Sequence, residues 1–312
     1  MATSAVLTKT VSQIIEEALR DARIIPAEQD VQAIDSARCL TALNNVTKFW
    51  QSQGINLWLE EEAVLPLVTG QRSYTLGPNG DNCTTAGDFV STTLSAAEAL
   101  GQTILSVTSS TGMTAADFVG IELDDGTRQW TTIVSVDSST QITVTDTLTA
   151  AAASGNTVYA YTTIIPRPVR LLSCRYADTV SGSEIPVNQW SRQEYFNQPD
   201  KDSSGTVVQW YYSPQLTDGV LYVWQVASSV NALVRFTYMS PALIYGATTD
   251  ALNFPGEWFV PLKWAIAAEV GPSYGLNEAR QAKLEANAGN TLQQVLSHDV
   301  EPGSMYLQPD FS

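Results

Sequence analysis

The chain contains few of the residues on which redox, metal and triad chemistry depend. Its 312 residues include three cysteines and one histidine. Cys39, Cys83 and Cys174 are odd in number and widely spaced, which indicates neither a disulfide framework nor a metal knuckle. No Ser-His-Asp or Cys-His set finds support around His298. We expect three buried thiols, and we predict no catalytic residue, no metal and no cofactor.

Basic residues are also scarce. Sixteen Lys and Arg stand against 32 Asp and Glu, which gives a formal net charge of −16 and an isoelectric point near 4.3. Tight wrapping of a nucleic acid needs clustered cations that displace counterions, so this class of binding is disfavoured. The charge still allows DNA to pass nearby without tight binding.

Long apolar runs are missing as well. No stretch approaches the roughly 20 apolar residues of a membrane span. Met1 to Leu7 lack the basic and apolar regions of a secretion signal. The sequence predicts a soluble protein made in the cytoplasm, without a membrane partner. Hydrophobic residues make up 44% of the chain, which is enough for real cores.

Both ends of the chain carry helical periodicity. The first apolar stripe predicts a helix over about 10–24, with Thr8 or Thr10 as its cap, and a second stripe continues from Val31 to Gly54. A short loop between them favours an antiparallel helical hairpin. Two more helices are predicted, one from near Pro255 to Gly271 and one that begins after Asn277.

Period-two patterns between the helices predict strands. Residues 64–68 and 74–76 are expected to pair through a turn at 69–71. Further strands are expected at 170–174, 185–187, 207–212, 220–226 and 232–238, the last three as an antiparallel β meander, with a short helix at 190–196. Glu60, Glu61 and Glu62 precede the first pair, and neighbouring side chains on a strand point to opposite faces. We expect a solvated acidic patch there.

Residues 82–163 differ in composition from the rest of the chain. They are rich in Ser and Thr, contain one basic residue, Arg128, and lie within a stretch without proline from 79 to 165. Turn signals at 124–127 and 137–140 predict hairpins, hence a small β sandwich or barrel whose two ends lie close together. Asp124, Asp125 and Asp137 lack the alternating ligands of a calcium loop.

Eight aromatic residues cluster in the following segment: Trp190, Tyr195, Phe196, Trp210, Tyr211, Tyr212, Tyr222 and Trp224. Such residues suit a nucleic-acid stacking platform or a sugar-binding surface. Because no cluster of Lys or Arg accompanies them, we expect core packing and subunit contacts instead.

The last 14 residues, here called the C-terminal arm (residues 299–312), contain two prolines and scattered large apolar residues without periodicity. This pattern favours an extended segment that docks on a partner through Met305, Tyr306, Leu307 and Phe311. A frayed tail is the alternative.

The predicted fold class is α+β. A discontinuous host domain, residues 1–81 and 164–298, combines two N-terminal and two C-terminal helices with the antiparallel β meander. Residues 82–163 form an inserted small all-β domain, and residues 299–312 form the arm.

The order of several short motifs resembles the head-to-tail adaptors of short-tailed bacteriophages, also called tail accessory or head-completion proteins. The motifs lie at Gly70 to Pro78, Arg167 to Arg170, Glu194-Tyr195, Val260 to Ala265 and Ser273 to Gly275. The resemblance implies a virion protein at the head–tail junction, made in the host bacterium. It implies a ring, dodecameric by analogy, that binds the portal protein and then tail nozzle or tail fibre proteins. The arm would then dock on the portal or on a neighbouring subunit, and the acidic ring would form a channel through which DNA leaves.

Two other classes remain open. The Ser/Thr-rich segment is compatible with a decoration protein or adhesin of the virion. A cell-wall hydrolase would need two paired carboxylates across a sugar-binding cleft, and the sequence offers no defensible pair.

Overall fold

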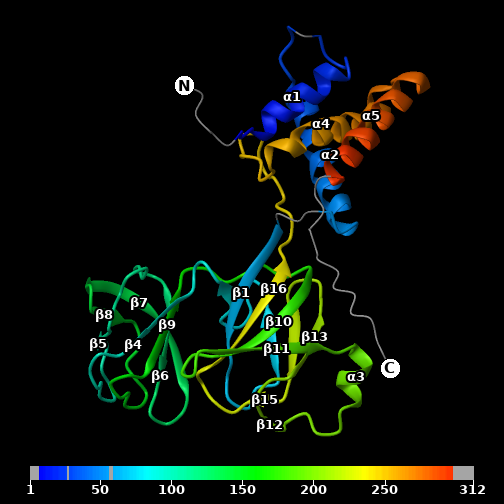
Figure 1. Ribbon diagram of the computed structural model, residues 1–312. Coiled ribbons are helices and arrows are strands. Elements are labelled where there is room, and N and C mark those ends of the chain that lie inside the picture. The colour runs from blue at the N-terminus through cyan, green and yellow to red at the C-terminus, as the bar shows by residue number, and fades with distance from the viewer. Residues whose placement is uncertain (1–6, 27, 56–58, 298–312) are drawn as a thin grey trace. The chain divides into compact units, whose positions relative to one another are not determined.

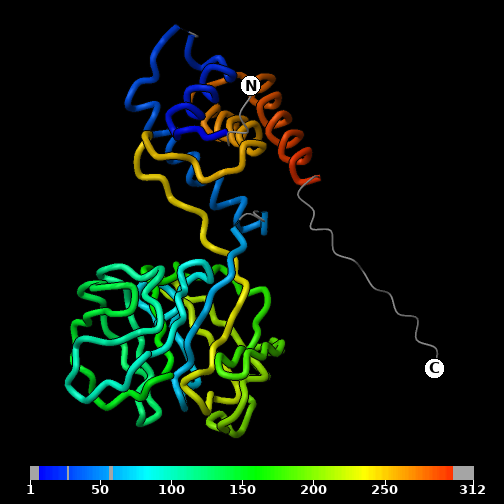
Figure 2. Tube along the Cα trace, turned by 60° about the vertical axis from the view of Figure 1, so that its left-hand side comes forward, coloured from blue at the N-terminus to red at the C-terminus, as the bar shows by residue number. Residues whose placement is uncertain are grey.

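The computed structural model describes residues 7–26, 28–55 and 59–297 and shows a mixed α and β protein. Two compact units emerge, one from residues up to Leu59 together with those from Ala242 onward, and one from Glu60 to Pro241. We call them the helical unit and the β unit. Both chain ends contribute to the helical unit, as the blue and orange parts of the trace in Figure 2 show.

The helical unit contains the four long helices that the periodicity predicts. They are α1 (Val11–Asp21), α2 (Ala33–Ser52), α4 (Phe259–Val270) and α5 (Glu278–Leu296), with the 3₁₀ turns η2 (Gly256–Trp258) and η3 (Gly271–Tyr274). Helix α4 packs against α1, α2 and α5 (Figure 1). The core includes a contact between Trp50 and Trp258, whose ring centroids lie 5.7 Å apart.

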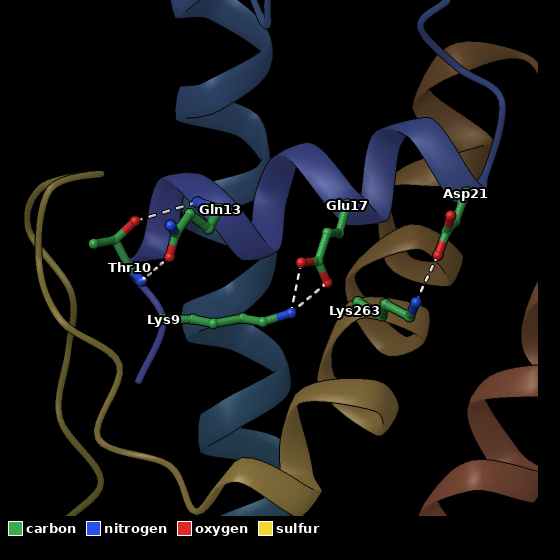
Figure 3. Close-up of polar contacts among 6 residues, drawn as sticks. All are labelled: Lys9, Thr10, Gln13, Glu17, Asp21 and Lys263. Atoms are coloured by element: carbon green, nitrogen blue, oxygen red, sulfur yellow. Dashed lines mark hydrogen bonds and ion pairs between the residues drawn. The ribbon is translucent and has the colours of Figure 1, made fainter. Parts of the chain in front are cut away.

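Local signals set the helix ends. Thr10 caps α1 through a capping box in which the Gln13 amide nitrogen donates to the Thr10 hydroxyl and the Thr10 amide nitrogen donates to the Gln13 side chain (Figure 3). The Asn277 side chain caps α5. Within the described ranges, no helix has the length and apolar character needed to cross a membrane.

The β unit contains an eight-stranded sheet in the order β2-β14-β13-β11-β10-β16-β1-β3. Its strands are β1 (Glu60–Pro66), β2 (Ser73–Leu76), β3 (Thr84–Thr85), β10 (Arg170–Asp178), β11 (Ser183–Gln189), β13 (Gln209–Ser213), β14 (Gly219–Trp224) and β16 (Ala232–Met239). All neighbours are antiparallel except β11 and β13. A small parallel pair, β12 (Ser204–Gly205) and β15 (Val226–Ala227), and helix α3 (Arg192–Asn197) complete this part.

Two predicted strand pairings are wrong. β1 does not pair with β2, because the Leu67 and Gly70 amides donate to the Ala232 and Ala227 carbonyls and guide the chain across to β14. The expected meander is limited to the β13–β14 hairpin, since β2 occupies the other edge of β14 and β16 lies between β10 and β1.

The Ser/Thr-rich segment forms a six-stranded antiparallel sheet, in the order β4-β9-β6-β7-β8-β5. Its strands are β4 (Val90–Thr93), β5 (Ile104–Ser106), β6 (Phe118–Glu122), β7 (Arg128–Ser138), β8 (Gln141–Val144) and β9 (Thr157–Tyr161). The predicted hairpins at 124–127 and 137–140 are confirmed. The sheet has an apolar core of its own, which includes Leu105, Val119 and Ile142.

The two ends of this segment meet, as expected: the Ile165 amide donates to the Cys83 carbonyl at 3.0 Å. The compact units nevertheless divide at 59/60 and 241/242, so both sheets belong to one unit, and domain boundaries at 82 and 163 stay a prediction. Val64, Ala177 and Leu233 of the larger sheet pack against Tyr159 of the smaller one.

Arg128, the one basic residue of the segment, also joins the two sheets. Its guanidinium donates to the carbonyls of Gly120, Thr157 and Val230 at 3.0–3.2 Å, and to the Asn231 side chain at 3.3 Å. It lies 3.8 Å from the Tyr159 ring centroid. Burial lowers the pKa of Arg128, while Tyr159 and Glu122 act to raise it. The cation serves cohesion of the β unit.

Candidate functional site

The described residues include an aromatic surface on the β unit that is built from α3, β13 and β14. Helix α3 is short but firmly started, because Ser191 and Glu194 form a capping box with distances of 2.6 and 3.3 Å. Tyr195, which follows Glu194 in α3, is buried against the sheet. Tyr211 and Tyr222 occupy opposed positions of the β13–β14 hairpin, so their rings fall on one face.

Four rings contact one another on this surface. The Tyr195 centroid lies 5.0 Å from that of Tyr222 and 5.5 Å from that of Phe196. Tyr211 stacks on Tyr222 at 5.7 Å, and Phe196 meets both of these tyrosines edge-on. Tyr211 and Tyr222 are half-buried, whereas Phe196 is 47% exposed. We call Tyr195, Phe196, Tyr211 and Tyr222 the aromatic surface.

Two cations of the aromatic segment, Arg192 and Lys201, lie against this surface, which the sequence interpretation did not expect. The Arg192 guanidinium lies 5.3 Å from the Phe196 ring centroid, and the Lys201 ammonium lies 6.0 Å from that of Tyr195. Arg72 pairs with Asp202 at 3.2 Å. Arg192 belongs to α3 and Lys201 to the loop after it, so both contacts with rings are local in the sequence.

The buried phenol of Tyr195 has an unusual environment. Its hydroxyl has no hydrogen-bond partner within the described part of the chain. Burial raises the pKa of Tyr195, Tyr222 and Asp202 raise it further, and the positive charge of Arg72 opposes them. The phenol therefore stays neutral near pH 7, and the ring acts as a packing centre for its neighbours.

The other aromatic residues of the predicted cluster have mainly structural positions. Trp210 and Tyr212 are buried, and their polar atoms donate to the Val187 and Pro168 carbonyls. The half-buried Trp190 and Trp224 stack with centroids 5.5 Å apart. Core packing is thus confirmed for part of the cluster, while the aromatic surface keeps area open to a partner. Partly exposed, rigid aromatic rings are typical of protein interfaces.

The acidic run at the start of β1 is tied into the larger sheet. The Tyr238 hydroxyl donates to Glu61 Oε2 at 2.7 Å, and Arg175 pairs with Glu62. Glu184 joins Arg175 to Arg235 through contacts of 3.6 and 3.4 Å. As alternation predicts, Glu61 and Glu62 face different partners and do not converge on one point.

The aspartates of the Ser/Thr-rich segment organise turns. Asp125 accepts from the amide and hydroxyl of Thr127, and Asp137 accepts from the Ser135 and Thr143 hydroxyls. These hydrogen bonds lower the pKa of both carboxyls. No group of three or more His, Cys, Asp or Glu suited to a metal ion occurs among the residues that the structure describes.

The three cysteines are free and buried, as expected. Burial raises the pKa of each thiol, to about 12 for Cys39, where Asp35 adds to the effect. The predicted docking residues Met305, Tyr306, Leu307 and Phe311 lie outside the described residues.

No protein-family model matches the chain, and no curated protein matches it.

Proposed function

We propose that this chain is a structural virion protein, a head-to-tail adaptor. Its copies form a ring, dodecameric by analogy, beneath the portal, connect the DNA-filled head to tail nozzle or tail fibre proteins, and leave an acidic channel for DNA. The observation that carries the proposal is the aromatic surface, which is suited to contact between subunits. The ordered motifs of the sequence are its second support.

The motif residues have positions that agree with such a scaffold. Tyr74, within the Gly70 to Pro78 motif, is buried, and its hydroxyl holds the preceding loop by accepting from the Val68 amide at 2.9 Å. The Pro168 carbonyl of the second motif accepts from Tyr212 at 2.6 Å. Pro261 and Leu262 are buried in α4. The motif residues therefore have structural positions in both units, and the proposal keeps residues 1–81 and 164–298 as host and 82–163 as the inserted domain.

The charge distribution supports a channel-forming role. Residues 60–241 carry 18 acidic and 8 basic residues, so the β unit holds most of the negative charge. A wall of carboxylates repels phosphates and lets DNA move without adhering. The isolated protein should show no appreciable binding to duplex DNA at physiological salt, measured by electrophoretic mobility. Tight, salt-sensitive binding would contradict the channel.

Native mass measurement of the protein, alone and mixed with its portal protein, tests the proposal. We expect a closed oligomer on the portal. Phe196→Ser should weaken assembly because it removes an open ring of the aromatic surface, whereas Phe49→Ser, at an exposed phenylalanine of the helical unit, should not. Failure of the wild-type chain to form any complex with the portal would refute the adaptor role.

The C-terminal arm has its own test. Truncation after Ser297 should leave a folded subunit that no longer assembles stably on the portal, because each large apolar side chain buried on docking contributes about 1–3 kcal/mol. Circular dichroism checks the fold and native mass measurement checks assembly. Full assembly by the truncated chain would contradict a docking role for Met305, Tyr306, Leu307 and Phe311.

A decoration or adhesin role is the second candidate, because the Ser/Thr-rich segment builds a sheet with its own apolar core. Electron microscopy with labelled protein distinguishes the two. Label at the head–tail junction supports the adaptor, and label spread over the capsid or fibres supports decoration. Loss of turbidity from purified cell walls would instead reveal a hydrolase.

A further inference from the structure

A cationic hollow in the helical unit stands out in this acidic protein. It has a volume of about 370 Å³ and is lined by residues that include Arg23, just after α1, Trp264 of α4, and Arg280, Lys283 and Leu284 of α5. Three of the chain's 16 basic residues thus meet at one concave site. Arg23 is far in the sequence from Arg280 and Lys283, which share α5, so no sequence motif indicates that the three meet.

These three cations have no partner among the residues that the structure describes. Within the described residues, no hydrogen bond or ion pair involves the side chain of Arg23, Arg280 or Lys283. Asp21 is the acidic residue of the lining, and it already binds Lys263 of α4 at 2.7 Å (Figure 3). The hollow therefore carries uncompensated positive charge.

Arg23 occupies a position where glycine is normally favoured. It follows the α1 C-cap with φ +53°, and the Arg23 and Ile24 amides donate to the Arg20 and Leu19 carbonyls, the hydrogen bonds of a Schellman motif. The equivalent residue after α2 is Gly54, with φ +73°. A long cation at a position that strains non-glycine residues adds to the positive charge of the hollow.

The residues that line the hollow determine which kind of ligand it can bind. Guanidinium groups bind carboxylates and phosphates through paired hydrogen bonds. Trp264 and Leu284 add apolar contact beside the charges. A carboxylate next to large apolar side chains uses both features, whereas a bare phosphate uses only the charges. The fitting ligand is an acidic peptide segment with apolar residues.

Residues 298–312 of this chain have that composition. They contain Asp299, Glu301 and Asp310, no Lys or Arg, and the apolar side chains of Met305, Tyr306, Leu307 and Phe311. We infer that the cationic hollow receives residues 298–312 of a neighbouring copy. This inference rests on the proposed ring and names the surface on which the arm docks.

Two full-length variants, one changed in the hollow and one changed in residues 298–312, test the contact. Arg280→Glu with Lys283→Glu removes the receiving charges, and Asp299→Lys with Glu301→Lys reverses the arm. Sedimentation analysis should show that each variant alone self-associates at least about tenfold more weakly than the wild type. An equal mixture of the two should regain association, because the intact arm of one variant meets the intact hollow of the other and the two reversed surfaces also carry opposite charges. Unchanged self-association of either variant would overturn the inference.

Controls separate the contact from folding and from the proposed function. Arg170→Glu changes an exposed cation of β10 and should associate like the wild type, and circular dichroism should show native helix content in every variant. A mixture that stays monomeric would overturn docking between copies. If the wild type assembles on the portal yet both variants assemble equally well, the docking inference fails while the adaptor role stands. If the wild type self-associates through the hollow but does not bind the portal, the adaptor role fails while the docking inference stands.

Discussion

Replacing Arg128 should loosen the junction between the two sheets of the β unit. The change Arg128→Met removes a guanidinium that reaches four residues, among them Val230 and Asn231 of the loop before β16. It also removes the cation 3.8 Å from the Tyr159 ring centroid. Methionine keeps the apolar stem, so the loss is mainly polar.

The size of the stability loss depends on which hydrogen bonds Glu122 keeps after Arg128 is replaced. Breaking a buried charged pair costs about 3–5 kcal/mol when the partner is left bare. The nearby carboxylate of Glu122 still accepts hydrogen bonds from the Thr157 amide and hydroxyl at 2.8 Å and from the Asn231 side chain at 2.9 Å. We therefore expect a loss of about 2–3 kcal/mol in the free energy of unfolding of the β unit.

Scanning calorimetry measures this change. At about 2–4 °C per kcal/mol for a unit of this size, the midpoint of the β-unit transition should fall by roughly 4–12 °C. Arg128→Lys keeps the charge but loses the planar fork, so it should fall between the wild type and Met. Arg170→Met, at an exposed cation, should change the free energy by less than about 0.5 kcal/mol. A wild-type midpoint for Arg128→Met would refute the reasoning.

Three further changes probe other parts of the molecule. Arg23→Gly should raise the stability of the helical unit by about 0.5–1 kcal/mol in thermal unfolding, since glycine adopts the left-handed backbone without strain, and a decrease would contradict this. Burial acts to raise the pKa of Asp88, but hydrogen bonds from Thr163, Thr162 and Thr84 outweigh it and hold this pKa below 3.8. The stability that Asp88 contributes is therefore present above about pH 3.8 and is lost as the pH falls through the lower pKa of the folded state. Asp88→Asn should make the free energy of unfolding depend less steeply on pH in acid, and identical acid unfolding curves would contradict this. Replacing residues 84–162 by a Gly/Ser linker should leave a cooperatively folding host that is less stable than the parent, because Val64 and Leu233 lose their cover, and loss of cooperative unfolding would count against an autonomous segment.

Helices were predictable because their signals are local. The stripe from Val11 to Leu19 is buried as its spacing requires, and Asn277 caps α5 where the sequence places it. Hairpins at 124–127 and 137–140 follow from their turn residues for the same reason.

Strand neighbours could not be predicted in the same way. Alternation tells which face of a strand is buried, but it does not identify the adjacent strand. The pairing of β1 with β16 and of β2 with β14 depends on backbone hydrogen bonds from the 67–70 loop to residues 227 and 232. The meeting of Arg23 with Arg280 and Lys283 at the cationic hollow likewise depends on tertiary structure that brings distant segments together.

The burial of all three cysteines makes the chain convenient for site-specific labelling. A thiol reacts with maleimides as its thiolate, and Cys39, Cys83 and Cys174 combine raised pKa values with inaccessible side chains. A single cysteine introduced at an exposed position, such as Leu216, would therefore be the reactive thiol among the described residues of the native protein. Paired fluorophores attached in this way could report distances between copies while the wild-type cysteines stay in place.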